Sequence, residues 1–233
     1  PNDRGGGLYV AGETTRVSMT NCLVSGNTAS MAGGGIANNG AVATLINCTI
    51  TGNTTKHGGG IHTAAYSTTT LTNCTVNGNT GSTQGGGICN IQNATATLMN
   101  CTVSGNTSFV GGGICNYSAT ATLAACTISG NAATGYFGGG IANHTSSTVS
   151  LTDCTISENT ALARGGGIYT YDASATLTNC IISENEVLHD GGGIYIEDAT
   201  ATLTNCTISR NTANTGGGMY SNTITATLAN CIV

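Results

Sequence analysis

Eleven cysteines are the residues of this 233-residue chain whose type and spacing first suggest chemistry. Nine of them recur at a nearly constant interval, whereas Cys89 and Cys115 lie in a different phase. The C-x₂-C and Cys/His spacings of zinc sites do not occur among them. Buried free cysteines usually act as small apolar side chains, so we expect the nine to form an inward-facing column. These nine are Cys22, Cys48, Cys74, Cys101, Cys126, Cys154, Cys180, Cys206 and Cys231.

The remaining two cysteines form a candidate disulfide. Cys89 and Cys115 directly follow Ile88 and Ile114, at a position where other copies of the repeat carry Tyr, Ala or His. If successive copies stack, the two α-carbons lie within the range that a disulfide requires. We therefore expect a Cys89–Cys115 disulfide if the protein is secreted, with two free thiols as the alternative.

Carboxylates are the second group that could do chemistry, and eight of the ten lie beyond residue 150. Asp172 and Asp198 share one phase of the repeat, and Glu158, Glu184 and Arg210 share another. Two carboxylates about 5 Å apart would suit a retaining glycosidase or a calcium site. The simpler interpretation is a solvated surface with a weak Glu184–Arg210 pair. The four histidines share no phase, so we assign them no metal. We expect no cofactor and no catalytic residue, because the repeat is regular and a catalytic site must break its symmetry.

Threonines form the third group, at alternate positions on either side of an Ala-Leu or similar apolar pair. On a strand these hydroxyls point outward, about 7 Å apart along the strand and ~4.8 Å apart between strands. The grid is similar to the T-x-T faces of ice-binding β-solenoids, and it could also bind sugars, contact another fibre or be ordinary strand surface. The residues of this candidate binding face are Thr68, Thr70, Thr95, Thr97, Thr120, Thr122, Thr200, Thr202, Thr225 and Thr227.

An aromatic column is expected beside the threonines. Tyr169, Tyr195 and Tyr220 follow three successive glycine triplets at the same distance. We expect these rings to be exposed, where they could stack on sugar rings or form ordinary strand surface.

A repeat of 25 to 28 residues positions all these groups. A Gly-Gly-Gly triplet begins nine times, from Gly5 to Gly216, and a cysteine follows each triplet. Three residues before each cysteine is Leu, or Met19 in the first copy, and two residues after it is Ile or Val. Apolar and polar residues alternate, which is the period of a β-strand. Three short strands and three turns per copy predict an all-β, right-handed parallel β-helix of about nine coils of ~26 residues, as a single domain over residues 1–233.

An asparagine follows each cysteine by five residues wherever the chain continues. Asparagine tolerates turn conformations, and stacked amides hydrogen-bond to the coils above and below. We therefore expect an asparagine ladder of Asn27, Asn53, Asn79, Asn106, Asn131, Asn159, Asn185 and Asn211.

Composition limits the classes of partner. Charged residues make up 6% of the chain, hydrophobic residues 39%, and the net charge is −5. The acidic balance excludes a nucleic-acid surface, and the apolar runs are too short for a membrane span. The high apolar fraction and regular spacing also exclude a disordered chain.

The repeat motifs resemble two known groups. The "GGGI" segments, followed by the "IxxN" of Ile50–Asn53 and Ile156–Asn159, resemble the repeats of the polymorphic outer-membrane proteins. The whole chain looks still more like secreted bacterial β-helix proteins of the pectate-lyase-like superfamily with "GGGIYN…TLTNCTISGNTA" repeats. This chain has Ile or Val where the outer-membrane family has Phe. The resemblance implies a bacterial secreted or cell-surface protein, often an adhesin.

The chain begins with "PNDRGGG" and stops at "NCIV", so both ends are expected to be uncapped. The last copy almost completes the first, which predicts head-to-tail stacking of identical chains, unless the sequence is cut from a longer array. We expect an extracellular structural β-solenoid, a surface fibre or adhesin-like module whose partner is itself. The alternatives are ice or carbohydrate binding through the threonine grid, including binding to cell-surface polysaccharide, and an enzyme that acts on polysaccharides.

Overall fold

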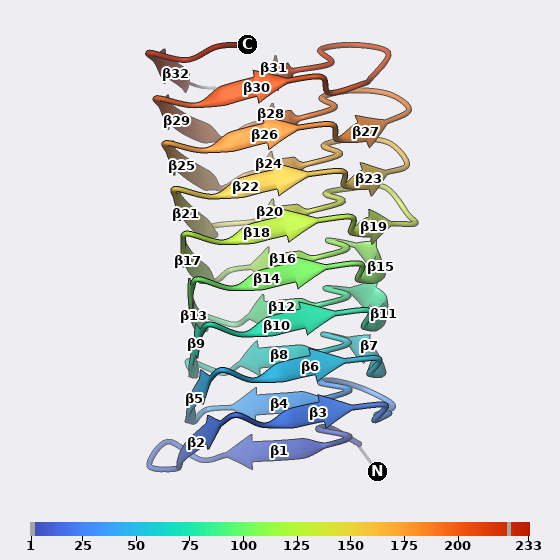
Figure 1. Cartoon of the computed structure of the whole chain (residues 1–233), viewed down its shortest axis with the longest axis vertical. Coiled ribbons are helices and arrows are strands. Elements are labelled where there is room, and N and C mark those ends of the chain that lie inside the picture. Colours follow the sequence, from blue (N-terminus) through green and yellow to red (C-terminus); the bar gives the residue numbers. More distant parts are fainter. Residues whose placement is uncertain (1–2, 223–224) are drawn as a thin grey trace.

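The computed structural model describes residues 3–222 and 225–233. In these residues all regular structure is β-strand, arranged as four parallel sheets that run along one elongated stack of coils (Figure 1). Two of the sheets contain nine strands, so the chain makes about eight complete turns between its first and last coils. The predicted parallel β-helix is therefore confirmed. Sequence analysis predicted three strands per coil and missed a fourth, so four sheets surround the core instead of three.

Sheet 1 follows the glycine triplets. Its strands begin with an Ile, Leu or Met that points into the core, as Ile61 does. The third residue of each strand also points inward, and the second points outward. The strands of sheet 1 are β1 (Leu8–Ala11), β4 (Ile36–Asn39), β8 (Ile61–Ala64), β12 (Ile88–Ile91), β16 (Ile114–Tyr117), β20 (Ile141–His144), β24 (Ile168–Tyr171), β28 (Ile194–Glu197) and β31 (Met219–Asn222).

Sheet 2 carries the alternating Thr-x-Thr segments. In the seven inner strands of this sheet the second and fourth residues, such as Ala121 and Leu123, are buried, and the first, third and fifth face outward. The strands of sheet 2 are β2 (Arg16–Thr20), β5 (Val42–Ile46), β9 (Thr68–Thr72), β13 (Thr95–Met99), β17 (Thr120–Ala124), β21 (Thr148–Thr152), β25 (Ser174–Thr178), β29 (Thr200–Thr204) and β32 (Thr225–Ala229).

Sheet 3 follows the cysteines and is built from three-residue strands. Only the central Ile or Val of each strand enters the core, as Ile128 does. The strands of sheet 3 are β3 (Leu23–Ser25), β6 (Thr49–Thr51), β10 (Thr75–Asn77), β14 (Thr102–Ser104), β18 (Thr127–Ser129), β22 (Thr155–Ser157), β26 (Ile181–Ser183) and β30 (Thr207–Ser209).

Sheet 4, the one that sequence analysis missed, follows the asparagine ladder. Its strands are short and contain small or polar residues, so no alternation was long enough to reveal them. Three residues of these strands, Ala133, Ala161 and Val187, form a small buried apolar cluster. The strands of sheet 4 are β7 (Thr54–His57), β11 (Thr80–Gln84), β15 (Thr107–Val110), β19 (Ala132–Ala133), β23 (Thr160–Ala161) and β27 (Glu186–Val187).

The glycine triplets bring sheet 4 back to sheet 1 at the tightest corner of the coil. The first glycine has a left-handed backbone, with φ of +61° at Gly85. A Cβ on the second glycine, Gly86, would lie 2.6 Å from the backbone nitrogen of Thr107 in the next coil. Because the backbones of successive coils touch at this corner, the triplet is a requirement of the fold and not a flexible linker.

Candidate functional site

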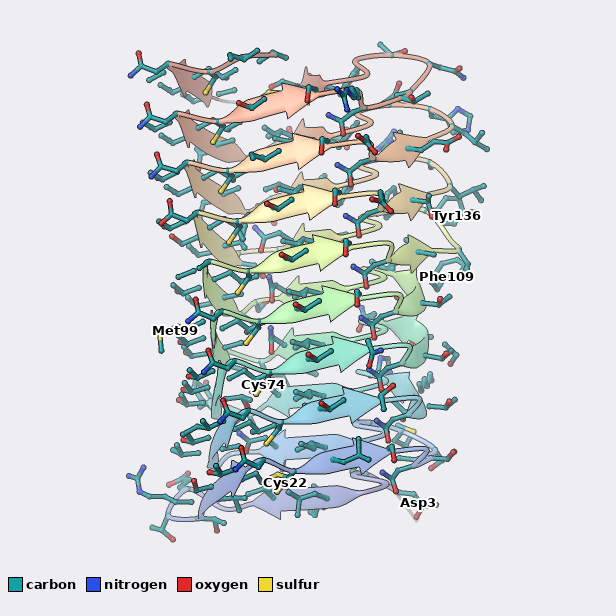
Figure 2. The ribbon with its side chains drawn as sticks, in the orientation of Figure 1. Asp3, Cys22, Cys74, Met99, Phe109 and Tyr136 are labelled. Carbon is teal, nitrogen blue, oxygen red and sulfur yellow. The ribbon has the colours of Figure 1, made fainter. Side chains whose placement is uncertain are left out.

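The cysteine column lies at the corner between sheets 2 and 3, and the sulfur atoms line up along the stack (Figure 2). The seven central cysteines, from Cys48 to Cys206, are buried as predicted, whereas Cys22 and Cys231 in the outermost coils are half-buried. Each thiol donates to the carbonyl oxygen two residues earlier, as from Cys126 Sγ to Ala124 O at 3.3 Å. Burial raises the pKa of the Cys206 thiol, and hydrogen bonding to Cys101 and burial raise that of Cys74. Hydrogen bonding to the neighbouring thiols of the column lowers the pKa of Cys101 and of Cys154. The column therefore closes a turn in each coil, and the pKa of its thiols differs from one coil to the next.

The candidate disulfide pair occupies in-register positions of neighbouring strands. Cys89 on β12 pairs with Cys115 on β16, and both side chains are fully buried. The structure carries them as free thiols. Their pairing stays a prediction.

The predicted asparagine ladder is present between sheets 3 and 4. Asn106 donates from its backbone nitrogen and from Nδ2 to Asn131 Oδ1, both at 3.0 Å. Its Nδ2 also donates to Val76 O of the preceding coil at 2.9 Å. The same pattern links Asn27 to Asn53 and continues to Asn211, and the six central side chains are inaccessible to solvent. Each amide of this inner ladder thus links its own coil by hydrogen bonds to the preceding coil and to the following coil.

A second asparagine ladder, which sequence analysis missed, lies outside, directly before the cysteines. Asn73 Nδ2 donates to Asn47 Oδ1 at 3.2 Å, and Asn205 Nδ2 to Asn179 Oδ1 at 3.1 Å. These residues have left-handed backbones, with φ of 53° at Asn73. In the outer ladder the later coil donates to the earlier one, the reverse of the inner ladder. The repeated Asn-Cys pairs were the signal that could have revealed it.

A polar column was also missed inside the core, at the third position of the sheet 1 strands. Asn38, Thr63, Asn90, Asn116 and Asn143 are all fully buried there. Asn90 Nδ2 donates to Asn116 Oδ1 at 2.9 Å, and Asn143 Nδ2 to Ser174 O at 2.9 Å. A hydrophobic pattern alone did not identify these amides, because they occupy buried positions that such a pattern assigns to apolar residues.

The threonine grid is an outward face of sheet 2, as predicted. Thr68, Thr95 and Thr120 are in register, and so are Thr70, Thr97 and Thr122. The structure extends this hydroxyl face through the middle coils that sequence analysis left out, where serine alternates with threonine. The first column of the hydroxyl face is Thr68, Thr95, Thr120, Thr148, Ser174, Thr200 and Thr225. The second column is Ser18, Thr44, Thr70, Thr97, Thr122, Ser150, Thr176, Thr202 and Thr227.

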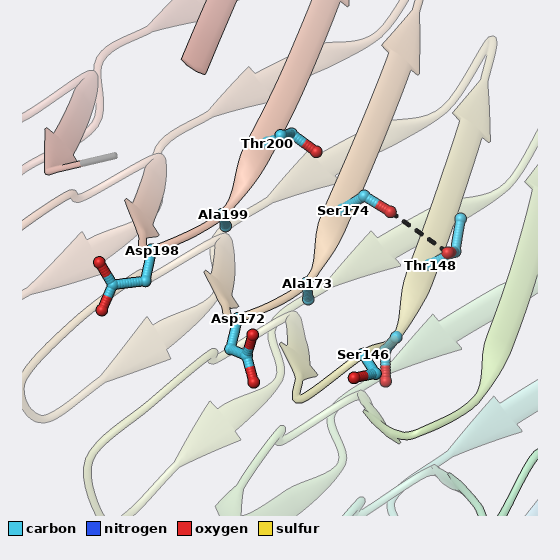
Figure 3. Close-up of a pocket in the computed structure, with 9 residues that line it drawn as sticks. Ser146, Thr148, Asp172, Ala173, Ser174, Asp198, Ala199 and Thr200 are labelled. Atoms are coloured by element: carbon cyan, nitrogen blue, oxygen red, sulfur yellow. Dashed lines mark hydrogen bonds between the residues drawn. The ribbon is translucent and has the colours of Figure 1, made fainter. Parts of the chain in front are cut away.

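A shallow cavity of about 320 Å³ opens at one edge of the hydroxyl face (Figure 3). Asp172 and Asp198, at the turns before β25 and β29, line it together with Ser146. Thr148 and Ser174 meet there through their hydroxyls at 3.2 Å. The second acidic group is an exposed ion pair, Arg210 Nη1 to Glu184 Oε1 at 3.2 Å. Both groups are surface features, as the simpler interpretation had it.

The expectation of an exposed tyrosine column was wrong for Tyr169 and Tyr195, whereas Tyr220 is half-buried and stacks on Tyr195 at 4.9 Å between ring centroids. Tyr169 and Tyr195 are only 3% and 2% exposed, because the segment before each glycine triplet covers the outer side of sheet 1. Phe137 stacks on Tyr169 at 4.6 Å between ring centroids, and Tyr169 on Tyr195 at 5.3 Å. Burial raises the pKa of Tyr169 to about 12.

Arg164 packs against Tyr195 and, together with Phe137, Tyr169 and Tyr195, forms what we call the aromatic corner. Its guanidinium lies 5.0 Å from the centre of the Tyr195 ring, and Nη1 donates to Glu197 Oε2 at 3.0 Å. Tyr195 also donates its hydroxyl to Glu197, at 3.0 Å. Outside this corner, Phe109 and Tyr136 remain exposed and meet edge to face (Figure 2). The rings of the column are therefore packing groups, so they do not offer faces to a sugar.

Of the four histidines, His57 and His62 line the same cavity and are close enough to interact. Burial, followed by repulsion from His57 and Arg4, lowers the pKa of His62 from 6.5 to about 4. Burial alone lowers that of His144 to about 4. In the described residues, no three His, Cys, Asp or Glu side chains are placed to hold a metal ion, and no helix is long and apolar enough to cross a membrane.

The buried His62 predicts weaker folding in acid. The unfolded chain takes up this proton below about pH 6.5, whereas the folded chain resists it until about pH 4. Stability is therefore complete above pH 6.5 and falls as the pH drops, by about 2 kcal/mol at pH 5. Urea unfolding at pH 7 and pH 5 measures the loss. His62→Ala, which copies Ala37 at the same position, is expected to lose this part of the pH dependence, and an unchanged difference would contradict the assignment.

Comparison with known protein families identifies a family model that matches two overlapping parts of the chain. The family model described as the right-handed beta helix region matches residues 2–128 and 84–233. No curated protein and no solved structure matches the chain significantly. The two matches together cover nearly every residue and agree with the stacked parallel sheets, so the chain belongs to the right-handed β-helix family.

Proposed function

We propose that the chain is a non-enzymatic structural module of a bacterial cell-surface or secreted fibre, adhesin-like, in which identical chains stack head to tail. One observation carries the proposal. The core columns run unbroken through the described coils, and equivalent side chains recur at each level. Because each coil packs on a neighbour of almost the same sequence, a coil of one copy can pack in the same way on a coil of another copy.

The two outer coils present matching columns. Leu8 begins the column that ends at Met219, Met19 the column that ends at Leu228, and Cys22 the column that ends at Cys231. Stacking the first coil of one copy on the last coil of another therefore continues each column with an equivalent side chain. Parallel strands and directional asparagine ladders allow only this head-to-tail arrangement, which does not close and so extends into a filament.

Charge favours the same arrangement. Residues 1–150 contain three Lys or Arg and two Asp or Glu, whereas residues 151–233 contain two Lys or Arg and eight Asp or Glu. Residues 151–233 of one copy, which are acidic, would approach the less acidic residues 1–150 of the next copy. Long-range attraction of this kind raises association rates at low salt and is screened at high salt.

Oxidative cross-linking tests the proposal. Cys22 and Cys231 are the two half-buried cysteines, and stacking would place them in one column. A mild thiol oxidant is expected to give a ladder of disulfide-linked multimers, together with filaments in negative-stain micrographs. Cys22→Ser should abolish the ladder, and Cys101→Ser, in the buried part of the column, should leave it unchanged. Separate short particles without a ladder at every concentration would overturn head-to-tail stacking.

The hydroxyl face supports a second candidate function, binding of ice or of a carbohydrate surface. The supporting observation is that two adjacent columns carry Thr or Ser on seven consecutive strands. Such a flat array of hydroxyls with strand spacing can match an ordered lattice of water or sugar oxygens.

A bulky side chain on the hydroxyl face separates this candidate from the first. If the face binds ice, a dilute solution shows thermal hysteresis, and Thr122→Tyr removes most of it by lifting the lattice away from the sheet. Thr127→Tyr, on the outward side of sheet 3, is the matched control. The absence of hysteresis, together with the absence of retention on polysaccharide columns, would overturn a binding role for this face.

A further inference from the structure

Two arginines occupy the same place in the repeat but have different surroundings. Arg4 and Arg164 both stand directly before a glycine triplet, on the outer side of sheet 1. Each donates from Nη1 to the last residue of a sheet 1 strand in the following coil. For Arg164 the acceptor is the carboxylate of Glu197, at 3.0 Å. For Arg4 it is the neutral amide oxygen of Asn39, at 3.2 Å.

The coil around Arg4 also lacks the ring that fills the corner at Arg164. Ala37 occupies the position that Tyr195 holds beneath Arg164, as the second residue of its sheet 1 strand. A cavity of about 190 Å³ lies beside Arg4. The residues that line it include Arg4, Met31, Ala32, His57, His62 and Ala64.

Polar groups in this cavity are left without partners. Arg4 Nε is buried and has no hydrogen-bond acceptor. His62 is 4% exposed, and none of the hydrogen bonds described for the chain involves its ring. His57 is held in place by Thr83 Oγ1, 3.0 Å from its Nδ1. Neither of the two ion pairs found among the described residues includes Arg4. Although Arg4 as a whole is only half-buried, its buried and unpaired Nε, with no counter-charge among the described residues, is unfavourable unless an anion satisfies it.

We propose that this cavity is a binding site for the carboxylate of a small aliphatic acid, which supplies to Arg4 the counter-charge that Glu197 supplies to Arg164. The carboxylate accepts hydrogen bonds from Arg4 Nε and from the His62 ring, forming charge-assisted bonds. Met31, Ala32 and Ala64 form an apolar wall that suits a short hydrocarbon body. The site is independent of the filament proposal, because all its groups lie within one chain.

A titration with sodium butyrate at pH 7 tests the site. The ring resonances of His57 and His62 in NMR spectra report binding. Saturable shifts at both rings are expected, with sodium chloride at the same ionic strength giving none. Arg4→Gln should weaken binding about tenfold or more, the effect of losing a charged hydrogen bond. Equal shifts with chloride, or no saturable shift with butyrate, would overturn the proposal.

The chain itself supplies the matched variant. Asn39→Glu copies Glu197 and places a carboxylate of the protein next to Arg4. It should abolish butyrate binding while preserving or raising the midpoint of thermal unfolding. Asn205→Ala, on the distant outer ladder, is the control and should bind butyrate like the natural chain. Unchanged binding to the Asn39→Glu protein would show that Arg4 is not the anion's partner.

Discussion

Replacing Asn131 with alanine is expected to lower the free energy of unfolding by about 4 kcal/mol, because several buried groups lose their partners together. The backbone nitrogen of Asn106 and its Nδ2 both donate to Asn131 Oδ1, and Asn131 Nδ2 donates to Val103 O at 2.9 Å. All of these atoms belong to fully buried residues, so water cannot replace the lost bonds without entering the core.

Urea unfolding followed by circular dichroism measures this loss. The control is Asn205→Ala in the outer ladder, where Asn205 is exposed and Ala125 already occupies the same turn position with φ of 51°. We expect the control to cost about 1 kcal/mol or less. Equal losses for the two variants would show that the inner ladder contributes no more than an ordinary surface turn.

Replacing Gly86 with alanine is expected to cost about 3 kcal/mol or more, because the new methyl group would meet backbone and not a movable side chain. Its Cβ would overlap the carbonyl oxygens of Gly112 and Thr107 and lie 2.6 Å from the nitrogen of Thr107. Two coils would have to separate locally to admit it. Since neighbouring coils stabilise each other, the loss should extend to the whole stack.

Gly105→Ala is the matched control for Gly86→Ala. Gly105 has φ of +60°, but the nearest atom to an added Cβ is 3.9 Å away. Glu158, Glu184 and Arg210 occupy the same turn in other coils with similar backbones. Gly105→Ala should lower the free energy of unfolding by about 1 kcal/mol, the penalty of a left-handed residue that is not glycine. Thermal unfolding of both variants decides the matter, and a tolerant Gly86→Ala would contradict close contact between coils.

The stacking of the coils was predictable because each core position recurs at one interval. The column of Cys48, Cys74 and Cys101 and the ladder at Asn53 and Asn79 follow from that interval alone. The burial of Tyr195 did not follow, because alternation assigns it to the outer side of sheet 1. Only the path of the chain before the glycines, set by turn geometry, reveals that Arg164 covers it.

The candidate sites, like the fold, could be predicted from the sequence only in part. The hydroxyl face could be read from threonines such as Thr95 and Thr97, although serine replacements hid its middle coils. The Arg4 cavity could not be predicted, because its lining residues, such as Arg4, His57 and Gln92, come from several coils and share no phase of the repeat. The interior Asn90 and Asn116 were hidden because they occupy positions that a hydrophobic pattern reserves for apolar residues.

The inner ladder has a consequence for the history of the gene. Every amide in it bonds to an identical amide one coil away, so a whole coil can be lost or duplicated and the new neighbours still find the same partner. Deleting residues 85–110 would join Gln84 to Gly111 in the correct phase. Recombination between misaligned copies can therefore lengthen or shorten such a protein without passing through an unfolded product.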